Sequence, residues 1–186
     1  MQAIIRKAQQ QDVYAYAACQ VASWRAAYKH IVPDEYLSAL SAERRAEWLS
    51  QSLREDQTCS YYCMLMDEEI IGVLVLGKAR DEERPNAGEI YAIYLLEAFW
   101  GQGFGAQLMR HAIESLRAMG YQEALLWALE ENSRARRFYE RAGFRPDGRQ
   151  KEIVLGKPLT ELCYTRPIGE SPSDPVCKVT GNPTPL

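Results

Sequence analysis

The stretch that most constrains the fold runs from Glu89 to Ala106 and reads EIYAIYLLEAFWGQGFGA. An apolar strand is followed, after a short connection, by Gly101, Gly103 and Gly105, and then by an amphipathic helix. A strand, glycine loop and helix in this order place backbone N–H groups at a helix start, where they can bind an anion such as a pyrophosphate. Glycine suits such a loop because a side chain would hold the phosphate away from the amides.

The loop alone allows other interpretations. It could be a glycine-rich turn without a ligand, although three glycines in five residues weaken a helix start. It also fits the dinucleotide-binding pattern G-x-G-x-x-G/A, which would suggest a nucleotide-binding oxidoreductase. Against a dinucleotide domain, the loop lies in the middle of the chain after a four-residue connection, and no second nucleotide-binding half is found.

Composition limits the class of protein further. At 186 residues the chain is long enough for one domain with a substantial core. A net charge of −3 argues against a nucleic-acid partner, and no apolar run approaches the roughly 20 residues that a membrane span needs. The N-terminus lacks the apolar core of a signal peptide, and five cysteines in a chain of this size indicate reduced thiols. We expect a cytoplasmic protein without a metal site, since no second Cys/His pair accompanies Cys59 and Cys63.

Hydrophobic periodicity predicts alternating strands and helices. The order favours an α/β (α+β) protein of three layers, a mixed central sheet with helices on both faces, in which the unit 89–129 is a parallel βαβ. We expect residues 169–186 to form a proline-rich C-terminal tail outside a domain of residues 1–168. The expected strands are 3–8, 60–66, 70–76, 89–96, 124–129, 153–155 and 159–164, and the expected helices are 12–28, 33–40, 41–55, 105–119 and 132–142.

A second motif makes the interpretation specific. Residues 132–144 read NSRARRFYERAGF, which is N-x-x-A-x-x-F-Y-x-x-x-G-F after an expected strand. Together with the upstream glycine loop, at this separation and in this order of elements, the chain resembles the GNAT superfamily of acyl-CoA-dependent N-acetyltransferases, bacterial type. The segment 24–28 (WRAAY) and the closing strand 159–166 are also similar to a bacterial subgroup of the family. The resemblance covers about residues 1–168 and implies the GNAT fold.

The resemblance implies a binding site for acetyl-CoA as co-substrate. The glycine loop would bind the pyrophosphate through its amides, the strand end would hydrogen-bond the pantetheine arm as an added strand does, and Asn132 would bind the pantetheine through its side chain. One position departs from the family: Trp100 stands where the signature usually has Arg or Gln, which puts a side-chain contact from that position in doubt. The implied residues are Ile93, Tyr94, Leu95, Gly101, Gln102, Gly103, Phe104, Gly105, Ala106, Asn132 and Tyr139.

Two residues match catalytic positions of the family. Glu89, four residues before Ile93, matches the commonest general base, and Tyr139 matches the residue that gives a proton to the departing thiolate. The chemistry is reasonable, because an amine with a pKa near 10 must lose a proton before it attacks a thioester. A backbone N–H near Leu95 would stabilise the tetrahedral oxyanion. The alternatives are an exposed strand-end carboxylate for Glu89 and a core aromatic for Tyr139.

The acceptor pocket is less well specified. Trp24, Tyr28 and Tyr91 are candidates, with Tyr91 expected on the same strand face as Glu89, but aromatic residues at helical spacing also build cores. Four arginines at 134, 136, 137 and 141 could contact the phosphates of CoA, although a solvated helix face is the favoured interpretation.

The sequence therefore predicts transfer of an acetyl group from acetyl-CoA to a primary amine of a small molecule or peptide, by direct attack in a ternary complex. A homodimer is possible by analogy with family members. The alternative from another class is a non-catalytic CoA-binding sensor or regulatory module, which needs no base.

Overall fold

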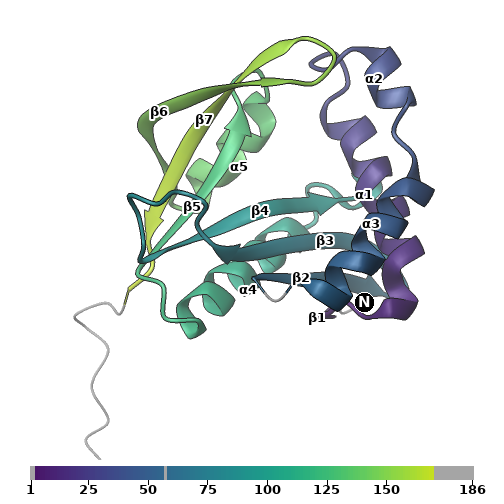
Figure 1. The fold of residues 1–186 in the computed structure, drawn as a ribbon, viewed down its shortest axis with the longest axis horizontal. Coiled ribbons are helices and arrows are strands. Elements are labelled where there is room, and N and C mark those ends of the chain that lie inside the picture. The colour runs from purple at the N-terminus through teal and green to yellow at the C-terminus, as the bar shows by residue number, and fades with distance from the viewer. Residues whose placement is uncertain (1–2, 57, 170–186) are drawn as a thin grey trace, which may run out of the picture.

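The computed structural model describes residues 3–56 and 58–169, which form alternating strands and helices (Figure 1). The tail predicted at 169–186 lies, apart from Gly169, outside the described residues. The strands are β1 (Ile4–Lys7), β2 (Cys59–Met66), β3 (Glu69–Lys78), β4 (Ala87–Leu95), β5 (Glu123–Leu129), β6 (Arg145–Val154) and β7 (Pro158–Pro167). The helices are α1 (Val13–Ala27), α2 (Asp34–Ser38), α3 (Ala42–Glu55), α4 (Phe104–Ala118) and α5 (Ser133–Arg141), with short 3-10 turns η1 (Gln10–Asp12) and η2 (Glu97–Phe99).

The strands of the described chain form one seven-stranded mixed sheet in the order β1-β2-β3-β4-β5-β7-β6. Only the β4–β5 pair is parallel, as predicted for the βαβ unit, and the other neighbouring pairs are antiparallel. Helices α1 and α3 pack on one face, and α4 and α5 pack on the other (Figure 1). The expected three-layer arrangement is confirmed.

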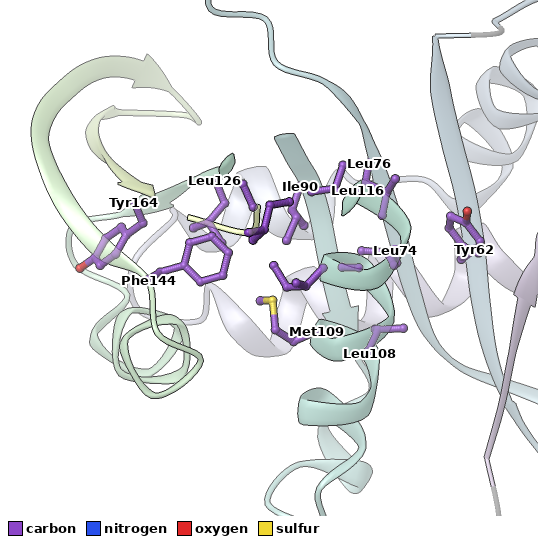
Figure 2. Packing of buried hydrophobic residues seen from close by; sticks show 14 of the residues in the cluster. Tyr62, Leu74, Leu76, Ile90, Leu108, Met109, Leu116, Leu126, Phe144 and Tyr164 are labelled. Atoms are coloured by element: carbon purple, nitrogen blue, oxygen red, sulfur yellow. The ribbon is translucent and has the colours of Figure 1, made fainter. Parts of the chain in front are cut away.

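The largest core cluster lies between the sheet and α4 (Figure 2). Leu108 and Leu116 of α4 and Leu74 and Leu76 of β3 are fully buried there. Burial of one such leucine contributes about 2 kcal/mol. Phe144, directly after α5, extends the same cluster toward β5 and β7, so the core fixes both helices that carry the two sequence motifs.

The prediction of β6 was too short. Strand β6 begins at Arg145, whereas sequence periodicity indicated a strand only from Ile153. The strand lies at the sheet edge, and its residues alternate between exposed and half-buried without an apolar face. Gly148, with φ of 88°, lies where the pairing with β7 shifts register. An edge strand of polar residues gives no hydrophobic period, and therefore periodicity could not reveal it.

Strand β4 has two irregularities next to the candidate site. The register with β3 passes from Leu76↔Ile90 to Val75↔Ala92, so Tyr91 is the extra residue of a β-bulge. Pairing with β5 covers only residues 87–89 of β4, after which the two strands diverge (Figure 1). In the second half of β4, the backbone groups on the side of β5 therefore make no hydrogen bonds to β5.

Helix α3 begins as the sequence indicated, and its cap gives a stability prediction. Ser41 Oγ accepts a hydrogen bond of 3.2 Å from the Arg44 amide. We expect Ser41→Ala to lower the free energy of unfolding by about 1 kcal/mol, because one amide of the first turn loses its partner. Urea denaturation measures the change. Ser41→Asp keeps an oxygen acceptor at the N-cap and should retain stability; equal losses in both variants would contradict the capping role.

Candidate active site

Two glycines of the loop adopt a left-handed backbone conformation. Gly101 and Gly103 have φ of 75° and 89°, values that L side chains rarely adopt, and Gly103 is the N-cap of α4. A Cβ at either position would meet no atom within 4 Å. The glycines are thus required by the backbone, and the space above them is open to a ligand. Gly105 instead permits close packing, since a Cβ there would lie 3.4 Å from the Phe138 ring.

A cleft of about 1060 Å³ begins at this loop. It is bounded by the end of β4, by α4 and by α5, and it reaches Ser23 and Ala27 of α1. Most of the predicted cofactor-binding residues are brought together on its wall: Ile93, Tyr94, Leu95, Gly101, Gly103, Gly105, Ala106, Asn132 and Tyr139. Gln102 and Phe104 do not line it; Gln102 Nε2 bonds the Ala98 carbonyl, and Phe104 is buried in the core.

Asn132 is 8% exposed and lies at the start of α5. Its Oδ1 accepts a hydrogen bond of 3.1 Å from the Ala135 amide and so caps the helix. Its amide NH2 makes no hydrogen bond within the described part of the chain, although Asn132 lines both the cleft and a second, smaller cavity. One side chain therefore fixes the helix with its oxygen and offers a donor to the cleft.

Tyr139 lines the cleft and the smaller cavity, which has a volume of about 30 Å³ and lies between the diverging strands. Burial raises the pKa of its phenol well above the ordinary value. The hydroxyl makes no hydrogen bond within residues 3–56 and 58–169. A neutral phenol at this junction is a proton donor that no other described group engages.

Glu89 is buried and does not face a cavity, unlike a catalytic carboxylate that is accessible to substrate. It is 1% exposed and lines neither cavity. Both carboxylate oxygens accept hydrogen bonds from the Arg80 guanidinium, and the Arg80 amide donates to Oε2 at 3.1 Å. The pair raises the pKa of Arg80, whose side chain is 64% exposed. Glu89 is therefore held below the surface by a guanidinium that itself faces outward.

The three aromatic candidates for the acceptor pocket occupy distinct places. Trp24 and Tyr28 pack edge to face, with ring centroids 5.0 Å apart, and the Tyr28 hydroxyl lies 3.0 Å from that of Tyr94. Tyr28 and Tyr91 line the smaller cavity, whereas Trp24 only supports Tyr28 and Tyr94. The Arg80 guanidinium contacts both Tyr91 and Glu89: its carbon lies 4.7 Å from the centroid of the Tyr91 ring, and its N–H groups bond the Glu89 carboxylate.

Sequence reasoning missed two features at or beside the smaller cavity. Trp127 of β5 lines the smaller cavity, and the Lys151 ammonium lies 4.0 Å from the centroid of its ring. Glu161, opposite Leu129 in the β5–β7 register, pairs with Lys151 at 3.3 Å. No motif marks these residues, because the pairing of β5 with β7 joins segments that are far apart in the sequence, from Leu129↔Glu161 to Glu123↔Pro167.

The cleft is rimmed by cations. Arg134, Arg137 and Arg141 of α5 line it, together with Arg110, Arg117 and Arg166. Of the four α5 arginines considered in the sequence, three line the cleft and Arg136 does not. Arg136 Nε instead donates a hydrogen bond of 2.9 Å to the Tyr164 hydroxyl. A basic rim around a glycine loop suits a ligand with several phosphates.

Other classes of site are not found. No group of His, Cys, Asp and Glu side chains among the described residues could hold a metal ion. No helix within the described ranges is long and apolar enough to cross a membrane. The four cysteines that the structure describes are free.

The fold and cleft together define an acyltransferase architecture, and comparison with known proteins gives the family. The family model "Acetyltransferase (GNAT) family" matches residues 23–144. N-acetyltransferase YuaI of Bacillus subtilis, described as uncharacterized, is 34% identical over 131 residues, which cover 69% of this chain and 72% of YuaI. The chain belongs to the GNAT family of acetyltransferases and is an N-acetyltransferase.

Solved structures agree on the fold. PaiA N-acetyltransferase from Thermoplasma acidophilum, in complex with coenzyme A, has a TM-score of 0.75 at 20% identity, covering 90% of this chain and 99% of PaiA. The structure of yncA from Salmonella typhimurium, solved with acetyl-CoA, has a TM-score of 0.68 at 16% identity, covering 95% of this chain and 100% of yncA. At these identities the likeness concerns the fold.

Proposed function

We propose that this N-acetyltransferase moves an acetyl group from acetyl-CoA to a primary amine of a small molecule or peptide by direct attack in a ternary complex. The observation that carries the proposal is the convergence of the glycine loop, the free edge of β4 and the Tyr139 hydroxyl on one cleft. Two proteins of the same fold are complexed with coenzyme A or acetyl-CoA.

The residues of the cleft fit acetyl-CoA. Open space above Gly101 and Gly103 suits the pyrophosphate, and the arginine rim supplies charge for it. The edge of β4 at 93–95 is not paired with β5. Apart from the Leu95 carbonyl, which accepts a hydrogen bond from Trp100 Nε1, it offers backbone groups to the pantetheine, as an exposed strand does to an added one. The amide NH2 of Asn132 supplies one more donor. Acetyl-CoA contributes the thioester, whose carbonyl carbon is the electrophile.

Two side chains carry the proton transfers in this proposal. Glu89, acting through water, takes the proton from the attacking amine as the C–N bond forms. A backbone N–H near Leu95 stabilises the oxyanion, and Tyr139 gives its proton to the sulfur as the C–S bond breaks. Tyr28 and Tyr91, at the smaller cavity, contact the acceptor, with Trp24 packed behind Tyr28.

One observation favours a second candidate, a CoA-binding sensor module without catalysis. Glu89 lines neither cavity, and Arg80 engages both of its oxygens. A module of this kind would retain the cleft and need no base.

Thiol release from acetyl-CoA, measured across polyamines, aminoglycosides, amino acids and short peptides, separates the two candidates. The catalytic proposal expects strong acceleration by at least one class of amine, and that class names the acceptor. Tight CoA binding without acceleration by any amine would favour the sensor module.

A further inference from the structure

Trp100 and Arg134 form a contact that links the two motifs of the cleft. The Arg134 guanidinium carbon lies 3.6 Å from the centroid of the Trp100 ring. The ring is itself fixed, because Trp100 Nε1 donates a hydrogen bond of 2.8 Å to the carbonyl of Leu95, the last residue of β4. Trp100 directly precedes Gly101, whereas Arg134 lies in the first turn of α5, and both line the cleft.

Few contacts within the described chain require an arginine at position 134. Within the described residues, the stack on Trp100 is the one polar or charged contact of its side chain, which is exposed. A cation in the first turn also opposes the helix dipole, which favours acidic residues there. Helix α5 has no acidic residue in that turn to offset it. Local stability therefore does not explain the position.

The place that Trp100 occupies explains it better. Trp100 directly precedes the glycine loop, and residues 100–106 of this chain carry no charged side chain. We propose that Arg134, held flat on the Trp100 ring, is a diphosphate-binding residue for acyl-CoA and supplies, from α5, the charge that the loop lacks. The inference rests on the proposed use of acetyl-CoA.

The chemistry of the pair supports this assignment. An arginine stacked on an aromatic face keeps the N–H groups at its planar edge for anions, and stacking fixes the guanidinium before the ligand arrives. A guanidinium binds phosphate oxygens through two parallel hydrogen bonds, which a lysine does not reproduce. The indole thus acts as a platform, and its hydrogen bond to Leu95 ties the platform to β4.

Calorimetric titration with CoA tests the proposal. We expect Arg134→Ala to weaken CoA binding about tenfold, the loss typical of a charge-assisted hydrogen-bonding group. Arg134→Lys should recover only part of the loss, since the planar stack is gone. Arg44→Ala is the matched control, because Arg44 is an exposed arginine in the first turn of α3 and lines neither cavity; its binding should equal that of the wild type.

Two further titrations locate the phosphate. With 3′-dephospho-CoA the tenfold loss in Arg134→Ala should persist, because the diphosphate remains; its disappearance would assign Arg134 to the 3′-phosphate and overturn the proposal. The double variant Trp100→Arg with Arg134→Ala, which places a cation at the start of the loop, should regain affinity relative to Arg134→Ala alone. If wild type binds CoA and Arg134→Ala binds it equally well, Arg134 has no phosphate role. Absence of CoA binding by the wild type would instead contradict the proposed function itself.

Discussion

Replacement of Tyr139 by Phe is expected to lower kcat about 100-fold, the range for loss of a general acid. The phenol lies where the cleft meets the smaller cavity, and burial raises its pKa, so it stays protonated throughout the usual assay range. Without the hydroxyl, the departing thiolate has no side-chain donor at that point. Steady-state kinetics with acetyl-CoA and the best acceptor amine measures the change.

The same variant carries its own stability control. The Tyr139 hydroxyl makes no hydrogen bond within the described chain, while the ring packs against Phe144 and Tyr164. Phe keeps the ring, and therefore the melting temperature and the affinity for CoA should match those of the wild type. A core role alone would leave kcat unchanged, and wild-type turnover in Tyr139→Phe would remove Tyr139 from the acid role.

Features that depend on neighbouring residues could be predicted from the sequence, whereas contacts between distant segments could not. The βαβ unit was predicted because its signals are local: an apolar run, glycines at 101 and 103 whose positive φ a side chain would resist, and a helical period ended by Gly120. The start of α5 was predicted for the same reason: either Asn132 or Ser133 suits an N-cap, and the structure has Asn132 there. Local chemistry of this kind is written in adjacent residues and needs no knowledge of the rest of the chain.

Interactions between distant segments were not predictable in this way. Nothing in the sequence near Trp100 indicates that Arg134, on another helix, covers its ring. Likewise, Arg80 lies nine residues before Glu89, across a polar loop, and only the hairpin of β3 and β4 brings the two together. The family resemblance indicated which residue types matter but gave no account of the partners that hold them.

Glu89→Gln is the second variant with a large expected effect. If Glu89 is the base, kcat/KM should fall about 100-fold at neutral pH with CoA affinity retained, because the amide cannot take the proton of the amine. The isosteric amide also weakens the pair with Arg80. Since Arg80 is largely exposed, that loss should cost only about 1–2 kcal/mol of stability, which thermal or urea unfolding measures.

Arg80→Met separates the base from the ion-pair partner. Methionine keeps an apolar stem against the Tyr91 ring and leaves Glu89 with the backbone amide of residue 80 as its donor. If Glu89 acts only by positioning Arg80, the two variants should lose the same activity. If Glu89 is the base, Arg80→Met should retain far more activity than Glu89→Gln, since the carboxylate is still present and less engaged. An unchanged pH–rate profile in Glu89→Gln would remove Glu89 from the base role, and the exposed guanidinium of Arg80 would then be the group that the buried carboxylate holds in place.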